Sequence, residues 1–247
     1  MDYESSTYLT AYALYGMAAA EEAGFAVDAN VKARAADFVK GALVAPKNVN
    51  EMYAANEQAW LLYVLARAGQ GDVARTSAWS EARQKRGVYA RAYLAMALHE
   101  LDEKDRRAQT IMSDLVNNAI LTATGAHWEE SEHDWWAMNT DTRTTAIVLD
   151  ALATVDPQNA LAPNVVRWLM VARRGDAWST TQESAWAVIA FTDYMAATGE
   201  LEADYTWGVA LNYEGLGSGV ANADTVRTTT RLTVDVAKLL TVHFFDE

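Results

Sequence analysis

The sequence predicts a mainly α-helical protein, a double-shelled α/α toroid followed by part of a β-sandwich. Three observations predict this class. The 247 residues include only three prolines and are rich in alanine and leucine, a composition that favours helices. A helical pattern recurs five times within the first 200 residues. From about residue 204 onwards, the pattern changes to the alternation that is typical of β-strands.

The recurring pattern is an alanine, a large residue directly after it, and a small and a large residue five and six positions further on. Small residues at regular positions let neighbouring helices approach closely, and the large residues fill the space between them. All five segments are apolar on most faces, which indicates helices that are surrounded by protein. The five copies begin at Ala11, Ala59, Ala92, Ala146 and Ala185.

Helices of a second kind are predicted between these segments. Residues 28–42 and 105–123 each place apolar side chains on a single stripe, and residues 73–84 and 164–173 form shorter versions. One apolar stripe is typical of a helix whose other face lies in water. Buried and surface helices therefore alternate, with a period of roughly forty residues.

The predicted helix ends agree with this alternation. Pro163 suits the first turn of a helix, where its missing N–H costs nothing. Left-handed C-terminal caps are predicted at Gly24, Gly69 and Gly199. N-caps are predicted at Asp28, Asp72 and Thr140.

Two architectures satisfy the alternation. An open solenoid stacks the helix pairs in a line, whereas a closed toroid places the buried helices in an inner ring. Apolar residues on most faces of the buried helices favour the ring. A ring of six inner helices would lack one here, so the sequence predicts an incomplete toroid with five of six inner helices.

The C-terminal part is predicted to be β-structure. Residues 205–213 and 228–236 alternate as strands do, and 241–245 are a third candidate. The glycines between the first two, Gly215, Gly217 and Gly219, are predicted to mark turns. We therefore expect a toroid domain over residues 1–202 and part of a β-sandwich over 203–247.

Charge and composition exclude several functions. The chain carries 20 Lys and Arg against 33 Asp and Glu, a formal charge of −13, which would repel the phosphates of a nucleic acid. No run of about eighteen apolar residues is present to span a membrane. There is no cysteine, so disulfides, cysteine nucleophiles and Cys-ligated zinc are excluded within this chain. The first residues are polar and acidic, unlike a signal peptide.

Three segments contain residues that could take part in catalysis or metal binding. Residues 127–136 (HWEESEHDWW) combine carboxylates, histidines and tryptophans, which could indicate a glycosidase or a metal site. Residues 139–143 (NTDTR) invite comparison with the acidic motif of terpene cyclases, and 179–184 (STTQES) contain serines without a nearby histidine. We favour structural roles for all three: a tryptophan-anchored loop or hairpin, a helix cap at Thr140 or Asp141, and a cap at Ser179 or Thr181. No catalytic residue, metal ligand or cofactor site is predicted.

Several stretches resemble the thioester domains of complement and α2-macroglobulin proteins. Residues 6–12 (STYLTAY) are similar to the start of the second inner helix, 165–169 (VVRWL) to the penultimate outer helix, and 178–185 (WSTTQESA) to the segment before the last inner helix. The order and spacing agree over residues 5–202. The bacterial branch is matched in particular by His127-Trp128, Trp135-Trp136 and residues 144–146.

The resemblance implies that the five inner helices are the second to the sixth of that family. The absent first helix begins with Cys-x-Glu-Gln, whose side chains form an internal thioester. No thioester residue is therefore expected in this chain, in agreement with its lack of cysteine. A related protein that has no thioester is the alternative.

The implied function is that of a non-enzymatic endopeptidase inhibitor that traps proteases. The expected partners are target proteases and other domains of the same parent chain, and the expected location is extracytoplasmic, with the export signal outside this sequence. Some complement-type relatives use a histidine before the third inner helix. Here residues 46–53 contain none, which favours direct attack by lysine amines, and Tyr53 is a candidate shield for the thioester. Residues 203–247 would then belong to a CUB-like or macroglobulin-like β domain.

Two other functions remain open at this point. A toroidal enzyme, either carbohydrate-active or similar to terpene cyclases, would need a deep central cavity with converging carboxylates. A helical-repeat scaffold would bind a protein partner on its concave face. A toroid that lacks an inner helix would also expose an apolar flank and a strand edge, so self-association of the chain is expected.

Overall fold

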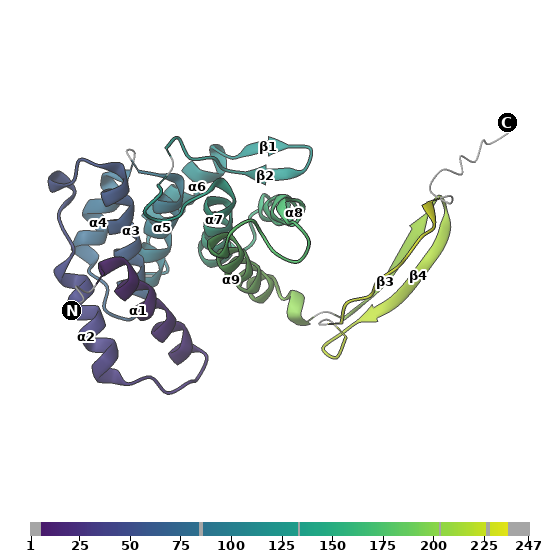
Figure 1. Cartoon of the computed structure of the whole chain (residues 1–247), viewed down its shortest axis with the longest axis horizontal. Helices are drawn as coiled ribbons and strands as arrows, with labels where there is room; N and C mark the ends of the chain where they lie inside the picture. Colours follow the sequence, from purple (N-terminus) through teal and green to yellow (C-terminus); the bar gives the residue numbers. More distant parts are fainter. Residues whose placement is uncertain (1–5, 84–85, 133, 203, 226–227, 237–247) are drawn as a thin grey trace. The chain divides into compact units, whose positions relative to one another are not determined.

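A computed structural model describes residues 6–83, 86–132, 134–202, 204–225 and 228–236 (Figure 1). Within these ranges the chain is mainly helical, with nine α-helices and two small two-stranded sheets, so the predicted helical class is confirmed. The chain divides into two compact units, Met1–Tyr194 and Met195–Glu247. None of the helices that the structure describes is both long and apolar enough to span a membrane.

Each copy of the repeat forms a helix whose buried fraction depends on its place in the series. These helices are α1 (Thr7–Glu22), α3 (Met52–Arg67), α5 (Val88–Leu101), α7 (Asp141–Val155) and α9 (Thr181–Thr198). Burial covers 11 of 16 residues in α3, 10 of 14 in α5 and 11 of 15 in α7. Only four of 16 are buried in α1 and five of 18 in α9. The three middle helices are therefore surrounded by protein, and the first and last are not.

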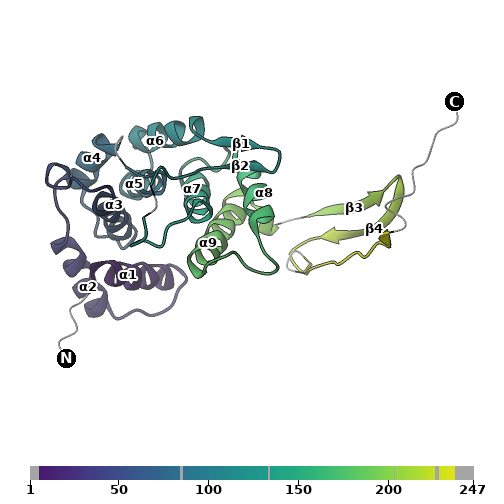
Figure 2. The same cartoon turned by 45° about the horizontal axis from the view of Figure 1, so that its top comes forward.

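The remaining helices cover this series from outside. They are α2 (Ala29–Gly41), α4 (Val73–Glu81), α6 (Arg106–Asn117) and α8 (Ala162–Ala172). Helix α6 packs on α5 and α7 (Figure 2). It buries Ala108, Ile111, Met112 and Leu115, which are spaced so that they share one face. The predicted alternation of buried and one-sided helices is therefore found from α2 to α8, whereas α1 and α9 are less buried than predicted.

Most predicted helix ends are correct. The Asp28 carboxylate accepts hydrogen bonds from two backbone N–H groups at the start of α2, and the Asp72 carboxylate accepts one from the Arg75 backbone N–H at the start of α4. The three predicted caps Gly24, Gly69 and Gly199 all have positive φ. Pro163 lies in the first turn of α8.

Two helix ends were predicted wrongly. The helix predicted over 105–123 stops at Asn117, and the chain continues as a hairpin of β1 (Ile120–Thr122) and β2 (Gly125–His127). Gly125 explains the change, because its φ is +136° and a Cβ there would lie 2.2 Å from the Asn164 carbonyl oxygen. Only glycine permits this close approach of β2 to α8.

The second wrong end is the N-cap of α9, which is Thr180 and neither Ser179 nor Thr181. The Thr180 hydroxyl accepts a hydrogen bond from the backbone N–H of Glu183, at 3.1 Å, and the Glu183 carboxylate accepts one from the backbone N–H of Thr180, at 3.2 Å. This reciprocal pair is a capping box. All three hydroxyl residues can cap a helix, and the glutamate three positions onwards selects Thr180.

The second unit contains an antiparallel pair, β3 (Tyr205–Leu211) and β4 (Glu214–Ala221). Its turn is formed by Asn212 and Tyr213, which both have positive φ. The glycines that were predicted to mark turns lie within β4 instead. Gly219 pairs with Trp207, and a Cβ there would lie 2.6 Å from the indole ring, so the glycine makes room for the tryptophan.

Further strands are not found in the described part of this unit. Residues 228–235 have no regular secondary structure, so the strand predicted over 228–236 is wrong. Alternation in sequence indicates which side chains would share a face, but a strand also needs a partner with which to pair. The strand proposed for 241–245 lies outside the described residues.

Candidate functional site

The centre of the helical unit is filled by aromatic side chains. Trp60 of α3 lies 5.1 Å from Tyr93 of α5, 5.8 Å from Trp186 of α9 and 5.5 Å from Tyr15 of α1, measured between ring centroids. Trp60, Tyr93 and Trp186 are at most 2% exposed. These contacts join the first and last helices of the series through side chains. Packed rings therefore fill the centre of the helical unit.

A buried arginine lies against this aromatic cluster. Arg143, in the first turn of α7, is 1% exposed. Its Nη1 donates a hydrogen bond to the Asn139 side-chain oxygen, and its Nη2 donates to the hydroxyls of Tyr12 and Tyr93. The guanidinium also lies over the Tyr89 ring, 5.2 Å from its centroid. Among the described residues, Arg143 forms no ion pair with a carboxylate, so rings and hydroxyls hold the charge.

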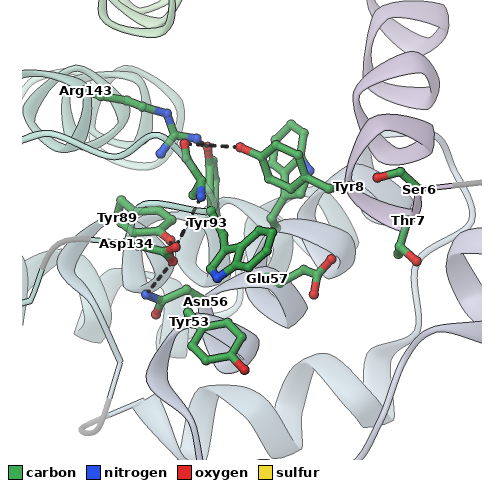
Figure 3. A pocket seen from close by; sticks show the side chains of 13 residues that line it. Ser6, Thr7, Tyr8, Tyr53, Asn56, Glu57, Tyr89, Tyr93, Asp134 and Arg143 are labelled. Carbon is green, nitrogen blue, oxygen red and sulfur yellow. Dashed lines mark hydrogen bonds between the residues drawn. The ribbon is translucent and has the colours of Figure 1, made fainter.

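A cleft of about 510 Å³ opens at the N-terminal ends of α1, α3, α5 and α7 (Figure 3). Its floor consists of buried groups and its mouth of exposed or half-buried ones. The floor is formed by Asn56, Trp60, Tyr89, Tyr93, Asp134 and Arg143. The mouth is formed by Ser6, Thr7, Tyr8, Tyr53, Glu57 and Trp136.

Asp134, in the loop before α7, forms hydrogen bonds with other residues at the floor of this cleft. Its Oδ2 accepts a hydrogen bond of 2.6 Å from the Tyr89 hydroxyl and a longer one from the Asn56 side-chain amide. Its Oδ1 accepts from the backbone N–H of Ala137. Burial and the adjacent Asp134 charge raise the pKa of the Tyr89 hydroxyl, which keeps it protonated as a donor. The hydrogen-bonding capacity of Asp134 is therefore largely used within the protein.

Glu57, by contrast, forms no side-chain hydrogen bond with the residues that the structure describes. It is half-buried on α3, and none of the described residues forms a hydrogen bond or an ion pair with its carboxylate. Burial, and then the negative charge of Asp134, raise the pKa of the Glu57 carboxyl. The Glu57 oxygens are not among the buried polar atoms that lack a partner, so water can reach them at the mouth of the cleft.

The other acidic side chains of the 127–136 segment have structural roles or lie in solvent. The two carboxylate oxygens of Glu130 accept hydrogen bonds from the backbone N–H groups of Val88 and Tyr89, at 2.9 and 3.0 Å, and so cap α5. Burial raises the pKa of Glu130. Glu129 and Glu132 are exposed. Glu130 is therefore occupied by capping and is not free to act as a glycosidase acid.

His127 and Trp128 also fit the structural interpretation, whereas Trp135 and Trp136 are largely exposed. The His127 ring stacks on Trp168 with centroids 4.6 Å apart, and its Nε2 lies 3.3 Å from Glu129 Oε1. Trp128 is buried and donates from Nε1 to the Leu115 carbonyl oxygen. Within the described ranges, no group of three His, Asp or Glu side chains could hold a metal ion. His133 lies outside them.

The two remaining candidate segments also serve as helix starts. The Thr140 hydroxyl accepts a hydrogen bond from the Arg143 backbone N–H, and it donates one of 2.7 Å to the Glu183 carboxylate. The Ser184 hydroxyl accepts from the Trp178 backbone N–H. Tyr53, the candidate shield, is the second residue of α3 and lies at the mouth of the cleft, with 49% of its surface exposed.

Sequence reasoning missed the cleft. Arg143 and Asp134 lay in quoted segments, but nothing in the sequence placed them beside each other. Glu57 was not singled out, although a charged residue inside an apolar helix is a signal that could have found it. No sequence signal links Asp134 to Tyr89, which lies 45 residues away along the chain.

Solved structures that are similar to this chain include alpha-2-macroglobulins from Salmonella and Escherichia coli. Salmonella alpha-2-macroglobulin reacted with methylamine matches 91% of the chain with a TM-score of 0.65 and 20% identity. Native Escherichia coli alpha-2-macroglobulin, from domain MG7 to the C-terminus, matches 91% with a TM-score of 0.64 and 15% identity. The E. coli protein activated by porcine elastase matches 91% with a TM-score of 0.64 and 17% identity.

The chain has the fold of bacterial alpha-2-macroglobulins. It spans 15%, 35% and 20% of these three alpha-2-macroglobulin chains, respectively. The similarity is one of structure, because no model of a known protein family and no curated protein matches the sequence.

Proposed function

We propose that the chain is the thioester-type toroid of a bacterial alpha-2-macroglobulin-like protease inhibitor, and that it shields and presents a thioester carried upstream. The observation that carries this proposal is the structural match over 91% of the chain to alpha-2-macroglobulins of Salmonella and E. coli. The packed aromatic centre argues against the alternative of a toroidal enzyme.

The uneven burial of the inner helices supports an incomplete ring. Helices α1 and α9, the ends of the series, each leave a stripe of small and apolar residues exposed. A sixth inner helix packed between them would bury both stripes and complete the double-shelled toroid. Without that helix, the stripes favour self-association of the chain. The stripes consist of Leu9, Ala13 and Gly16 on α1, and Ala185, Val188 and Thr192 on α9.

The cleft supports a site for the thioester. Because the inner helices begin at the same end, a sixth helix running in the same direction would begin beside Ser6 and Thr7 at the mouth. The family's Cys-x-Glu-Gln begins that helix. The exposed ring of Tyr53 would then lie over the thioester and keep water from it. Residues 1–202 form the toroid in this proposal, and residues 203–247 belong to a CUB-like or macroglobulin-like β-sandwich.

The role of the parent protein follows from the same proposal. It would be a non-enzymatic trap in the cell envelope, periplasm or extracellular space. Its partners would be target proteases, as in the E. coli proteins activated by elastase or trypsin. Other domains of the parent chain would contact the exposed stripes or the β domain.

Methylamine labelling of the longer parent protein tests the proposal. We expect incorporation of methylamine into the segment upstream of Ser6 and the release of one thiol per amine incorporated, because an amine that opens a thioester frees its cysteine. A variant with alanine in place of that cysteine should incorporate none. An upstream segment of unrelated type, with no incorporation and no released thiol, would contradict the proposal.

A further inference from the structure

A layer of charged residues follows the aromatic centre towards the C-terminal ends of the inner helices. Trp60, Tyr93 and Trp186 each have a charged residue seven positions further along the same helix. Residues seven positions apart lie on the same face of a helix, two turns from each other, so this layer continues the face that carries the aromatic rings. The three charged residues are Arg67 on α3, Glu100 on α5 and Asp193 on α9.

Asp150 adds a buried carboxyl from α7 to this charged layer. It follows Ile147, the large residue of the repeat in α7, by three positions and is fully buried. Among the described residues its oxygens have no hydrogen-bond partner other than the Asp193 carboxyl. Of the charges that act on Asp150, that of Asp193 is the strongest, followed by those of Arg67 and Glu100. Adjacent carboxyls that are withdrawn from water do not both ionise at neutral pH without a cation, so these two share a proton.

Arg67 is the one cation of the charged layer in the described part of the chain, and its hydrogen bonds go elsewhere. Its Nη1 donates to the Tyr63 hydroxyl at 3.2 Å, and its Nη2 donates to the Glu22 carboxylate at 2.8 Å. The guanidinium lies over the Tyr15 ring, 5.3 Å from its centroid. No ion pair between described residues joins it to Asp150 or to its carboxyl partner. The layer therefore has an excess of negative charge.

This charged layer borders the position of the proposed sixth inner helix. Asp193 is half-buried on α9, directly after Thr192 of the exposed stripe. The corresponding position on α1, seven residues after Tyr12, is Ala19, which is also half-buried. A helix between α1 and α9 would thus meet a carboxyl on one neighbour and a single methyl group on the other. A long side chain from that helix could pass the alanine and reach the two aspartates.

We infer that the sixth helix supplies a lysine or arginine side chain that forms an ion pair with both Asp150 and Asp193. The cation would replace the shared proton and let both carboxyls ionise at neutral pH. An arginine fits especially well, because its fork of N–H groups can donate to two carboxylates at once. The residue would lie about three turns after the start of its helix, which is the depth of Asp193 in α9 and of Ala19 in α1.

This inference deepens the proposed function and rests on it. A buried ion pair has one favourable geometry, so it can fix the register of a helix against its neighbours. A fixed register would set the depth at which the first residues of the sixth helix, with the thioester, lie at the cleft. The two aspartates are therefore positioning residues, at the opposite end of the inner helices from the thioester.

Hydrogen–deuterium exchange of Asp150→Asn tests the inference, in this chain and in the parent protein extended upstream. In this chain, where the two carboxyls share a proton, the substitution should slow exchange in α7 and α9 about tenfold at pH 7. In the parent protein it would remove a carboxylate that is paired with a cation, so exchange there should become about tenfold faster. An effect of the same sign in both proteins, or none in the parent protein, would overturn the inference.

The pH dependence should also differ between the two proteins. A carboxylate paired with a cation has a lowered pKa, and its stabilisation is present above the unfolded-state pKa of about 4. After correction for intrinsic exchange rates, α9 of the parent protein should therefore be better protected at pH 7 than at pH 4. In this chain α9 should be less protected at pH 7. A structural role of the aspartates without a cation would give the same direction in both proteins, which would contradict the inference.

Two further variants and the upstream sequence sharpen the test. Asp193→Asn, which removes the other carboxylate, should speed exchange in α9 of the parent protein about threefold, because this side chain is less buried. Asp37→Asn is the control, a side chain 79% exposed on α2, and should change exchange in neither protein. Replacing the upstream lysine or arginine by methionine should reproduce the effect of Asp150→Asn without adding to it. A sixth helix that packs but has no lysine or arginine at that depth would overturn the inference.

Failure of the inference and failure of the proposed function are distinguishable. Slower exchange in α1 and α9 of the unmodified parent protein shows that an upstream helix packs there, and methylamine incorporation shows a thioester. If both are found and Asp150→Asn does not reverse its effect, the inference alone is wrong. If no upstream helix packs, both are wrong.

Discussion

Trp60→Ala is expected to lower the free energy of unfolding of the helical unit by about 3–5 kcal/mol, the range for removing a fully buried tryptophan. Trp60 is 2% exposed, and its ring lies within 6.2 Å of five aromatic neighbours on four helices, its own α3 among them. Replacing it would leave a cavity where α1, α5 and α9 meet. The rest of the cluster cannot collapse into that cavity without moving whole helices.

Trp136→Ala is the matched control, a second tryptophan of the same cleft that is 82% exposed. It should change the free energy of unfolding by less than about 0.5 kcal/mol. Urea unfolding followed by circular dichroism measures both. If Trp60→Ala prevents folding, Trp60→Phe keeps most of the volume and should cost about 1–2 kcal/mol. Equal effects of Trp60→Ala and Trp136→Ala would contradict the packed aromatic centre.

Asp150→Asn is expected to stabilise the protein at neutral pH by about 1–3 kcal/mol, because asparagine has no proton to lose and so avoids the cost of burying a carboxyl whose pKa is raised. Asp150 lies on α7 with no exposed surface, and among the described residues its oxygens have no hydrogen-bond partner other than the Asp193 carboxyl, with which Asp150 can share a proton. Burial, and then the negative Asp193 on α9, raise the pKa of Asp150 well above its ordinary value. Arg67 opposes this shift and Glu100 adds to it.

The sign of the pH dependence follows from this raised pKa. Above the unfolded-state pKa of about 4, the unfolded chain loses the Asp150 proton while the folded chain retains it, so stability falls as pH rises. Asparagine does not titrate, so the variant does not lose stability in this way as the pH rises. The stabilisation by Asp150→Asn should therefore be small at pH 4 and grow towards pH 7.

Thermal unfolding at several pH values between 4 and 8 provides the measurement. Asp37→Asn is the control, because the Asp37 side chain is 79% exposed on α2 and should give no comparable pH-dependent gain. A destabilising effect of Asp150→Asn at pH 7 would show that the carboxylate is paired in the folded state.

The repeat in the sequence indicated the helices and also several of the residues in the central aromatic cluster. The large residue directly after each repeat alanine is Tyr12, Trp60, Tyr93 or Trp186 in four copies, and these four converge at the centre. A regular position on helices that pack side by side places those side chains on a common face. The sequence could not show that the fifth copy, in α7, contributes Arg143 from the turn before its alanine.

Features that depend on distant partners were not predictable. Glu130 caps a helix that begins 42 residues earlier, and the end of α6 depends on the approach of β2 to α8. The glycines of β4 look like turn residues until Trp207 is placed opposite Gly219. In each case the local sequence allows more than one structure, and a contact between separate elements selects one of them.

The central claim is that a sixth inner helix, supplied upstream, packs between α1 and α9. Hydrogen–deuterium exchange of this chain, compared with a version extended upstream in the parent protein, tests it most directly. The extension should slow exchange in α1 and α9, where four of 16 and five of 18 residues are buried here, and leave α3, α5 and α7 unchanged. Unchanged exchange in α1 and α9, with the added segment folding by itself, would contradict the claim.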